Sequence, residues 1–374
     1  MEGMTHRPHP SKGSTLRRFS PCLLIALACT IGTVDATGLR GAGVPLLQDV
    51  TPSEIAGLSQ SWAIDQDRQG LVYVANMAGL LQYDGVRWRK ISLPGDAAFA
   101  VAADRRQDRV YVGGQNTLGH VEPDSLGLPR YVSLMDALPD SLAEFGAVSR
   151  LLARPDGLHA VCDAGVLVLN ADTLTAFHPA EHVHQFAFDV RDRFWVWDYD
   201  RGLQTIDPDS GLVVAPGLED TTNDPQTIWL PLPDGRYLAS TFGAGALQVW
   251  DGDSLRAFPS EAGAYLQEHS PYCGTALPDG RLAIGTLSGG LVVLETDGSP
   301  AMRLTKRDGL PDDRILGLDL DRDGGLWLAM SQGIARVEIG GELTVFDDRR
   351  GITGGLVEIL RHQGDLYAAT NFGV

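Results

Sequence analysis

Short apolar segments rich in β-branched and aromatic residues recur eight times along the chain, and each ends in small or polar residues. The eight segments are VYVAN (72–76), VYVGG (110–114), HAVCD (159–163), FWVWD (194–198), YLAST (237–241), LAIGT (282–286), LWLAM (326–330) and LYAAT (366–370). A glycine follows each segment within five positions: Gly79, Gly119, Gly165, Gly202, Gly245, Gly290, Gly333 and Gly373. Their separations of 37–46 residues correspond to the roughly 40–45 residues of one four-stranded β-propeller blade.

Each repeat contains the elements of such a blade. A first strand alternates apolar and polar residues, as in AFAVAAD (98–104), and an Asp/Gly turn such as RPDG follows it. The apolar segment is the second strand, the glycine opens the third, and a more polar fourth stretch ends the repeat, as in RWRKISL (87–93) or LTVF (343–346). Because the first two strands are apolar on both faces, neighbouring blades are expected to cover them. The sequence therefore predicts an all-β fold, a propeller of seven complete four-stranded repeats plus a partial eighth over residues 59–374.

The eighth repeat stops at Val374, one residue after its glycine. Two explanations remain open. The segment VPLLQDV (44–50) supplies the missing outer strand and closes the ring, or the propeller is incomplete at its C-terminus and the chain is part of a longer protein. We favour the second. Residues 37–58 form an N-terminal extension that contains the candidate closing strand.

The first 36 residues have the pattern of a secretory signal peptide. Basic residues precede a 14-residue apolar run (21–34), and Val34, Asp35 and Ala36 offer small residues for cleavage. Such a run is shorter than the roughly 20 residues of a membrane-spanning helix. The prediction is export to the periplasm of a Gram-negative bacterium.

The net charge limits the binding partners that we expect, and the positions of the cysteines indicate whether they form a disulfide. The net charge is −18, and it becomes −20 without the first 36 residues. A protein with this field repels phosphate backbones, so we expect no nucleic-acid partner. Cys162 and Cys273 lie in different repeats and different strands. They are expected to be free thiols because a disulfide requires Cα atoms about 4.4–6.8 Å apart.

The stretch AIDQDRQGLVYVANMAGLLQYDGVRWRKI (63–91) resembles a two-component regulator propeller repeat, and LGLDLDRDGGLWLAMSQGIARVE (316–338) resembles it equally well. The stretch GHVEPDSLGLPRYVSL (119–134) is similar to the second blade of sensor propellers that precede a triple-tyrosine domain. The resemblance implies an extracytoplasmic ligand-binding region, followed in that family by a sandwich domain, a membrane helix and a kinase, cyclase or DNA-binding output. It implies no particular ligand-contacting residue, because the repeat motif is structural.

Two motifs suggest metal chemistry but fit the repeat better. His178, Glu181 and His182 match H-x-x-E-H, which binds zinc only when a helix presents both imidazoles on one face. Here Pro179 interrupts it in a short link between repeats. Asp319, Asp321 and Asp323 begin like a calcium loop, but the twelfth position is Met330. A polar linker and a β-turn are the simpler interpretations, and we predict no metal and no cofactor.

The mouth of the central channel is the expected ligand site, because the starts of the innermost strands meet there. The residues at these starts can hydrogen-bond or stack on a polar ligand: Gln60, Trp62, Ser149, His184, Gln226, Tyr272 and Arg314. The alternative is that they only fill the axis with water-bridged polar groups.

The favoured hypothesis is a non-enzymatic sensor propeller, the input domain of an inner-membrane receptor with downstream signalling domains. Its ligand is expected to be small and polar, a carbohydrate being one such ligand, and a homodimer is a further expectation. The alternatives are a periplasmic propeller enzyme (a lyase or hydrolase) and a protein-docking propeller.

Overall fold

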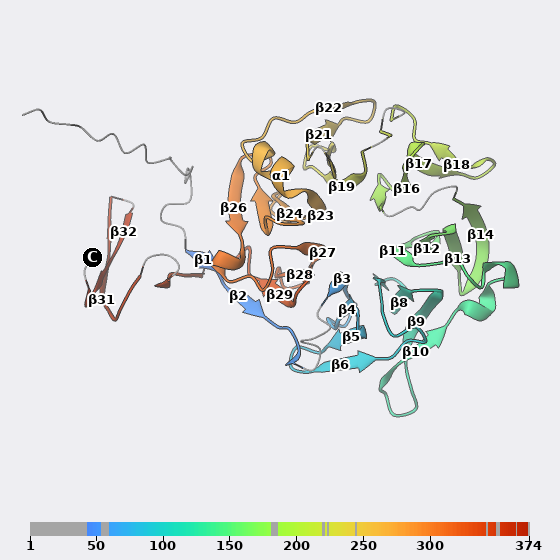
Figure 1. Ribbon diagram of the computed structural model, residues 1–374, viewed down its shortest axis with the longest axis horizontal. Coiled ribbons are helices and arrows are strands. Elements are labelled where there is room, and N and C mark those ends of the chain that lie inside the picture. The colour runs from blue at the N-terminus through green and yellow to red at the C-terminus, as the bar shows by residue number, and fades with distance from the viewer. Residues whose placement is uncertain are drawn as a thin grey trace, which may run out of the picture. The chain divides into compact units, whose positions relative to one another are not determined.

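The computed structural model describes residues 43–53, 60–180, 186–218, 221–222, 224–243, 245–341, 343–348, 352–363 and 365–372. These residues belong to the compact unit Gly41–Val374. In the described part of the chain, seven four-stranded antiparallel sheets are arranged as blades around one axis (Figure 1). The predicted propeller, with seven complete repeats and a partial eighth, is confirmed. The predicted signal peptide (1–36) lies outside the described residues.

Blades one to six each use four consecutive strands, with the innermost strand first in sequence. From the axis outwards they are β3 (Ser61–Gln66), β4 (Val72–Asn76), β5 (Gly79–Tyr83) and β6 (Trp88–Ile91); β7 (Ala100–Asp104), β8 (Arg109–Gly114), β9 (Thr117–Pro123) and β10 (Pro129–Ser133); β11 (Val148–Arg154), β12 (Gly157–Cys162), β13 (Gly165–Asn170) and β14 (Thr173–Pro179); β15 (Ala187–Val190), β16 (Arg193–Asp198), β17 (Gly202–Asp207) and β18 (Gly211–Val214); β19 (Gln226–Pro231), β20 (Tyr237–Thr241), β21 (Leu247–Trp250) and β22 (Leu255–Ala257); β23 (Pro271–Ala276), β24 (Leu282–Thr286), β25 (Leu291–Leu294) and β26 (Pro300–Leu304).

Blade seven joins the two ends of the ring. Its inner strands are β27 (Ile315–Leu320), β28 (Leu326–Met330) and β29 (Ile334–Val337), and its outer strand is β2 (Leu47–Asp49) from the N-terminal segment. Leu47 pairs with Val337, and Asp49 pairs with Ala335. The segment 44–50 therefore completes the seventh repeat and not the eighth.

The prediction that LTVF (343–346) forms the fourth strand of the seventh repeat was wrong. Its strand β30 (Thr344–Val345) pairs with β1 (Val44–Pro45) in a separate two-stranded sheet. The reason is that β2 already occupies the outer edge of β29, so this edge has no free hydrogen-bonding groups for a further strand.

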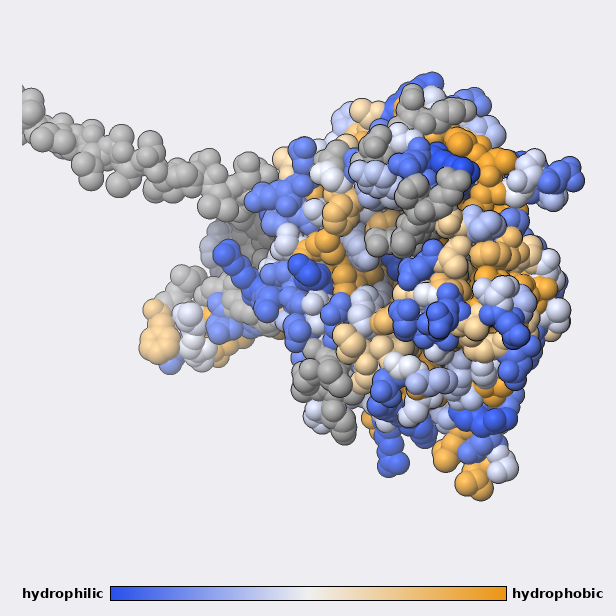
Figure 2. Space-filling model, turned by 45° about the vertical axis from the view of Figure 1, so that its right-hand side comes forward, coloured by the Kyte–Doolittle hydropathy of each residue, from blue (hydrophilic) through white to orange (hydrophobic). Residues whose placement is uncertain are grey.

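The eighth repeat is a hairpin of β31 (Leu356–His362) and β32 (Asp365–Thr370). Its apolar side chains remain exposed, with Val357 at 73% and Leu360 at 60% of their accessible surface. Apolar atoms reach the visible surface of this hairpin (Figure 2). The hairpin is thus formed without the neighbours that bury equivalent strands in the ring.

The core of the ring lies between blades. Among the described residues, seven clusters of buried apolar side chains occupy the seven interfaces between adjacent blades. Strand Val72–Asn76 is buried at every position, as expected for a strand covered on both faces.

Among the helices that the structure describes in full, each is a short connection. These are η2 (Met135–Ala137), η3 (Asp140–Leu142), α1 (Gly263–His269) and η4 (Lys306–Asp308). Within the described ranges, no helix is long and apolar enough to span a membrane. Cys162 and Cys273 are free.

The segment that resembles a calcium loop forms the turn between β27 and β28. The carboxylate of Asp321 accepts hydrogen bonds from the backbone amides of Asp323 (2.9 Å) and Gly325 (2.8 Å). Its second oxygen accepts a hydrogen bond from the indole of Trp327 (3.0 Å). Asp321 therefore has the structural role that Asp takes in a tight turn.

Candidate functional site

The predicted ligand residues lie where the innermost strands begin. Gln60 precedes β3, Trp62 lies in β3, Ser149 in β11, Gln226 opens β19, Tyr272 lies in β23 and Arg314 precedes β27. Because every blade repeats the same strand order, the innermost strands run in one direction and all begin on one face of the ring. We call this the entry face. His184 lies outside the described residues.

Two of these residues contact an aromatic ring of another blade. The ring of Trp62 contacts that of Phe99 edge to face, with ring centroids 4.9 Å apart. Tyr272 of blade six meets Phe186, which precedes β15 of blade four, at 5.5 Å. Blades four and six are not neighbours, so this second contact can form only at the axis.

Phe99 and Phe186 were not among the predicted residues. Each precedes an innermost strand directly, as Gln60 does. That sequence position was the signal that could have found them.

The other predicted residues do not join this aromatic group. The Ser149 hydroxyl donates to the Val161 carbonyl at 3.3 Å, and Arg314 is exposed and donates to the Leu287 carbonyl at 3.4 Å. Gln226 is buried and lines a pocket at blade five.

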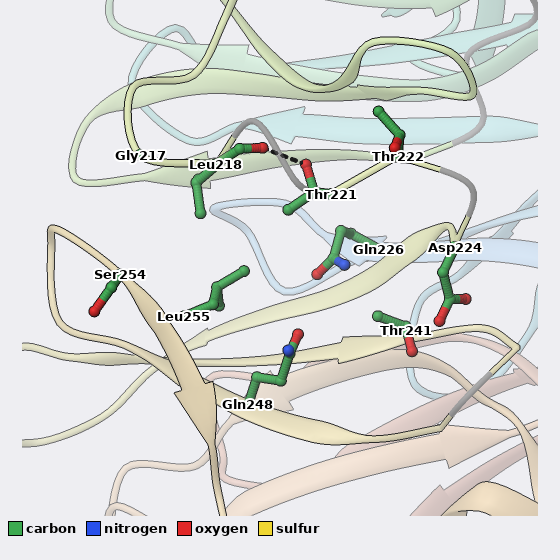
Figure 3. A pocket seen from close by; sticks show the side chains of 10 residues that line it. All are labelled: Gly217, Leu218, Thr221, Thr222, Asp224, Gln226, Thr241, Gln248, Ser254 and Leu255. Carbon is green, nitrogen blue, oxygen red and sulfur yellow. Dashed lines mark hydrogen bonds between the residues drawn. The ribbon is translucent and has the colours of Figure 1, made fainter.

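This pocket has a volume of about 400 Å³ and lies beside the connection from blade four to blade five (Figure 3). Its lining is mostly hydroxyl and amide side chains: Gly217, Leu218, Thr221, Thr222, Asp224, Gln226, Thr241, Gln248, Ser254 and Leu255. The amide groups of Gln226 on β19 and Gln248 on β21 point toward each other across the pocket (Figure 3).

Thr221 attaches one wall of the pocket to blade four. Its hydroxyl donates to the Leu218 carbonyl (2.7 Å) and accepts from the Leu203 amide (2.9 Å). Its carbonyl accepts from the indole of Trp197 at 2.8 Å. The opposite wall consists of β19, β20 and β21 of blade five, so a ligand in the pocket would touch both blades.

Blade five contains polar atoms that are buried without a partner. Gln226 and Thr241 are adjacent across strands β19 and β20, and they are only 2% and 6% exposed. Neither Oε1 of Gln226 nor Oγ1 of Thr241 has a hydrogen-bond partner. Of the eight such atoms among the described residues, five belong to blade five: Gln226, Trp229, Ser240, Thr241 and Trp250. Leaving a buried polar group unpaired costs about 1–3 kcal/mol, so a ligand that pairs with these atoms would recover part of that cost.

The electrostatic character of the pocket favours a neutral ligand. Among the described residues that line it there is no basic side chain, and the one carboxylate among them, Asp224, already accepts a hydrogen bond from the backbone amide of Gly243 at 2.8 Å. Hydroxyl and amide groups can both donate and accept hydrogen bonds.

An acidic pair lies toward the opposite end of the axis. Asp65 at the end of β3 and Asp319 near the end of β27 flank the guanidinium of Arg105, with Nη2 at 2.8 Å and 3.7 Å from their carboxylate oxygens. Burial, and then the negative charge of Asp65, raises the pKa of Asp319 to about 8. The sequence analysis missed this pair because turn aspartates are common in every repeat.

The metal-like motif H-x-x-E-H begins on a strand. His178 lies in β14, opposite Val166 of β13, while Glu181 and His182 lie outside the described residues. Within the described ranges, no group of three or more His, Cys, Asp or Glu side chains is placed to hold a metal ion.

Neither a protein-family model nor a curated protein matches this sequence. Among solved structures, the extracellular domain of the putative hybrid two component system BT3049 from B. thetaiotaomicron is similar, with a TM-score of 0.64 and 14% identity over 87% of this chain and 47% of that one. The corresponding domain of BT4673 from B. thetaiotaomicron has a TM-score of 0.62 and 18% identity over 85% of this chain and 44% of that one.

A streptogramin B lyase structure is also similar, with a TM-score of 0.60 and 14% identity over 78% of this chain and 96% of that one. The chain therefore spans less than half the length of the two extracellular domains and nearly the whole length of the lyase. At these identities the similarity establishes the propeller fold, which sensor domains and an enzyme share.

Proposed function

We propose that this chain is the ligand-binding propeller of an extracytoplasmic sensor, and that the pocket at blade five holds the ligand. The observation that carries the proposal is the pair of buried polar atoms without partners on residues that line the pocket, Oε1 of Gln226 and Oγ1 of Thr241. Folded proteins rarely keep such atoms unsatisfied, and they do so mainly where a ligand or water completes the bonds. The fold shared with two extracellular sensor domains supports the same conclusion.

The ligand is a small neutral molecule rich in hydroxyl or amide groups, and a carbohydrate meets this description. It would join the wall attached to blade four with the wall formed by blade five. Ligand binding favours whichever arrangement of the two blades makes the better contacts. In the complete protein, an inner-membrane receptor with a kinase, cyclase or similar output would detect this change, and pairing of two copies would be one way to transmit it.

The alternative function, a propeller enzyme, has one observation in its favour. Nδ1 of His269 lies 2.9 Å from the Ser288 hydroxyl near the entry face, and a lyase shares the fold. Among the described residues of the pocket at blade five, however, Asp224 is the one titratable side chain, and its carboxylate already accepts a backbone amide. Because acid–base catalysis needs a group that can exchange a proton with the substrate, we assign binding and not catalysis to this pocket.

Calorimetry and thermal shift with a panel of neutral oligosaccharides and polyols test the proposal. Thr241 has a natural control in Thr286, because each ends the second strand of its blade. The Thr286 hydroxyl is satisfied: it donates to the Gly290 carbonyl (2.9 Å) and accepts from the Gly289 amide (2.8 Å). The Thr241 hydroxyl has no partner.

We expect Thr241→Val to lose ligand binding without losing stability. Thr286→Val should lose about 1–3 kcal/mol of stability and bind the ligand as the wild type does. A ligand that binds wild type and Thr241→Val equally would exclude this pocket.

A further inference from the structure

Arg150 projects from β11 of blade three into the central channel. Its guanidinium carbon lies 5.6 Å from the centroid of the Phe186 ring, which in turn contacts Tyr272 of blade six. Strands β11 and β23 lie on opposite sides of the axis (Figure 1). Arg150, Phe186 and Tyr272 therefore form one group on the axis, contributed by blades three, four and six.

A second observation places the charge of Arg150 near blade six. Burial raises the pKa of the Cys273 thiol to about 12, and the positive charge of Arg150 acts on the same thiol in the opposite direction. Cys273 follows Tyr272 on β23. The guanidinium is thus close enough to the far side of the channel to act on groups there.

The guanidinium of Arg150 is partly buried and lacks an acidic partner. Among the described residues, no carboxylate lies within ion-pairing distance of it; its one hydrogen bond goes from Nη1 to the backbone carbonyl of Ser149 at 2.9 Å. Other arginines on the ring, such as Arg109 and Arg154, pair with aspartates. A guanidinium has five N–H donors, so most of those of Arg150 have no acceptor among the residues that the structure describes.

Partial exposure along the innermost strands gives a ligand access to this group. In β11 the residues Ser149 and Arg150 are partly exposed, and in β23 every residue after Pro271 is partly exposed. Strand β19, by contrast, is buried at all but its last position. A ligand can therefore reach both Arg150 and Tyr272, as it can parts of β3 and β27.

We propose that the axial channel holds a second ligand site, in which Arg150 binds the carboxylate of a small organic acid and the ring of Tyr272, which packs against the buried ring of Phe186, contacts its flat apolar body. One guanidinium matches one carboxylate in charge and in its paired hydrogen-bond geometry. The aromatic rings supply apolar area and stacking. A phosphate ester carries more charge than this single cation balances, in a protein with a net charge of −18.

This site is separate from the pocket at blade five. None of Arg150, Phe186 and Tyr272 lines that pocket, and the two sites differ in ligand charge. Failure of one proposal therefore leaves the other standing.

Benzoate is the probe, with the neutral benzamide as its isosteric comparison and phenyl phosphate as the test of anion class. Binding is measured by calorimetry and thermal shift at constant ionic strength, because general charge effects depend on salt. Wild type should bind benzoate and be stabilised by it, and should bind benzamide and phenyl phosphate more weakly.

Arg150→Gln should weaken benzoate binding about 10- to 100-fold, since it removes a charge-assisted pair of hydrogen bonds. Arg150→Lys, which keeps the charge without the planar fork, should lose less. Arg130→Gln is the matched control: Arg130 is exposed, pairs with Glu122 and lies far out on β10, so this variant should bind benzoate as the wild type does.

Three outcomes would overturn the proposal: no benzoate binding by folded wild type, equal binding by Arg150→Gln, or stronger binding of phenyl phosphate than of benzoate. Tyr272→Ala tests the aromatic wall independently of charge. It should weaken benzoate binding but leave the preference for benzoate over benzamide in place, and loss of that preference would count against the assigned role of Arg150.

Discussion

Strands β27–β28 of blade seven and β31–β32 of the hairpin have the same sequence pattern and opposite environments. Both pairs begin with the same irregularity in register, between Ile315 and Gly317 in the ring and between Leu356 and Glu358 in the hairpin. Yet Ile315 is fully buried, whereas Leu356 is 50% exposed. The pattern is thus sufficient to specify a pair of strands and its register, while burial depends on the neighbouring repeats.

Gly317 shows how the neighbouring blade restricts which residue can occupy a position in an innermost strand. A Cβ atom at Gly317 would lie 2.8 Å from the backbone oxygen of Trp62 in blade one. At the corresponding place in the hairpin, Glu358 carries a long exposed side chain. Glycine is needed at this position only where the innermost strands of two blades converge.

Removing one end segment at a time tests this comparison most strongly. A chain that begins at residue 51 lacks β1 and β2, which exposes the edge of β29 and the contacts of buried Val44. We expect a loss on the order of 5 kcal/mol or more, comparable with the whole stability of many domains. A chain that ends at residue 348 lacks the hairpin and should unfold in urea at the wild-type midpoint. Equal destabilisation by both truncations would contradict the comparison.

Matched truncations of side chains come next in size. Ile315→Ala creates a cavity in the cluster between blades six and seven and should cost about 2–5 kcal/mol. Leu356→Ala removes a half-exposed side chain and should cost less than about 0.5 kcal/mol. Urea unfolding of both variants measures the difference, and a large effect of Leu356→Ala would mean that something buries the hairpin in solution.

Adding a methyl group at Gly317, where β27 approaches β3 of blade one, should have a smaller effect on stability. Gly317→Ala should destabilise the ring by about 1–3 kcal/mol, because the added methyl group is forced against backbone. Glu358→Ala in the hairpin should leave the unfolding midpoint within error. If Gly317→Ala is also neutral, the two innermost strands are further apart than described here.

The pH dependence of Asp319 gives the smallest effect. Its pKa is raised to about 8 by burial and by Asp65, so the folded protein holds its proton more tightly than the unfolded chain does, where Asp titrates near 3.9. This contribution to stability is complete below about pH 4 and is lost as the pH rises through about 8. The guanidinium of Arg105 also lies beside Asp319, and the negative charge of Asp67 acts in turn on Asp65.

Asp319→Asn keeps the neutral form at every pH. We expect it to match the wild type near pH 5 and to exceed it at pH 9 by on the order of 1–3 kcal/mol, measured as melting temperature across the pH range. Leu360, the corresponding hairpin residue, provides the control: Leu360→Asn should show no such pH dependence. A constant difference between Asp319→Asn and wild type at all pH values would contradict the raised pKa of Asp319.

Much of the fold could be predicted because each repeat carries its own local signals. Turn aspartates, glycines of positive φ and apolar strands identified seven blades and the eighth hairpin. The outer strand of blade seven could not be assigned in the same way. Residues 47–49 carry no repeat signature, and only the free edge of β29 at the end of the ring explains their pairing.

The candidate site was predicted only in part. Strand order alone placed Trp62 and Tyr272 at the starts of innermost strands, where the structure also has them, and their role in ligand binding stays a prediction. Arg150 was missed since a residue inside a strand gives no sign that it reaches across the channel. The pocket at blade five was missed because the connection after β18 forms one of its walls, and connections lack the periodicity from which strands are predicted.

The amino-acid sequence by itself determined the all-β class, the number of blades and the position of each turn, because these depend on interactions within about 45 residues. Tertiary structure alone decided which end closes the ring, which side chains meet on the axis and which polar atoms of blade five remain unpaired. Those features depend on contacts between residues that are distant in sequence, and the geometry of the closed ring sets these contacts.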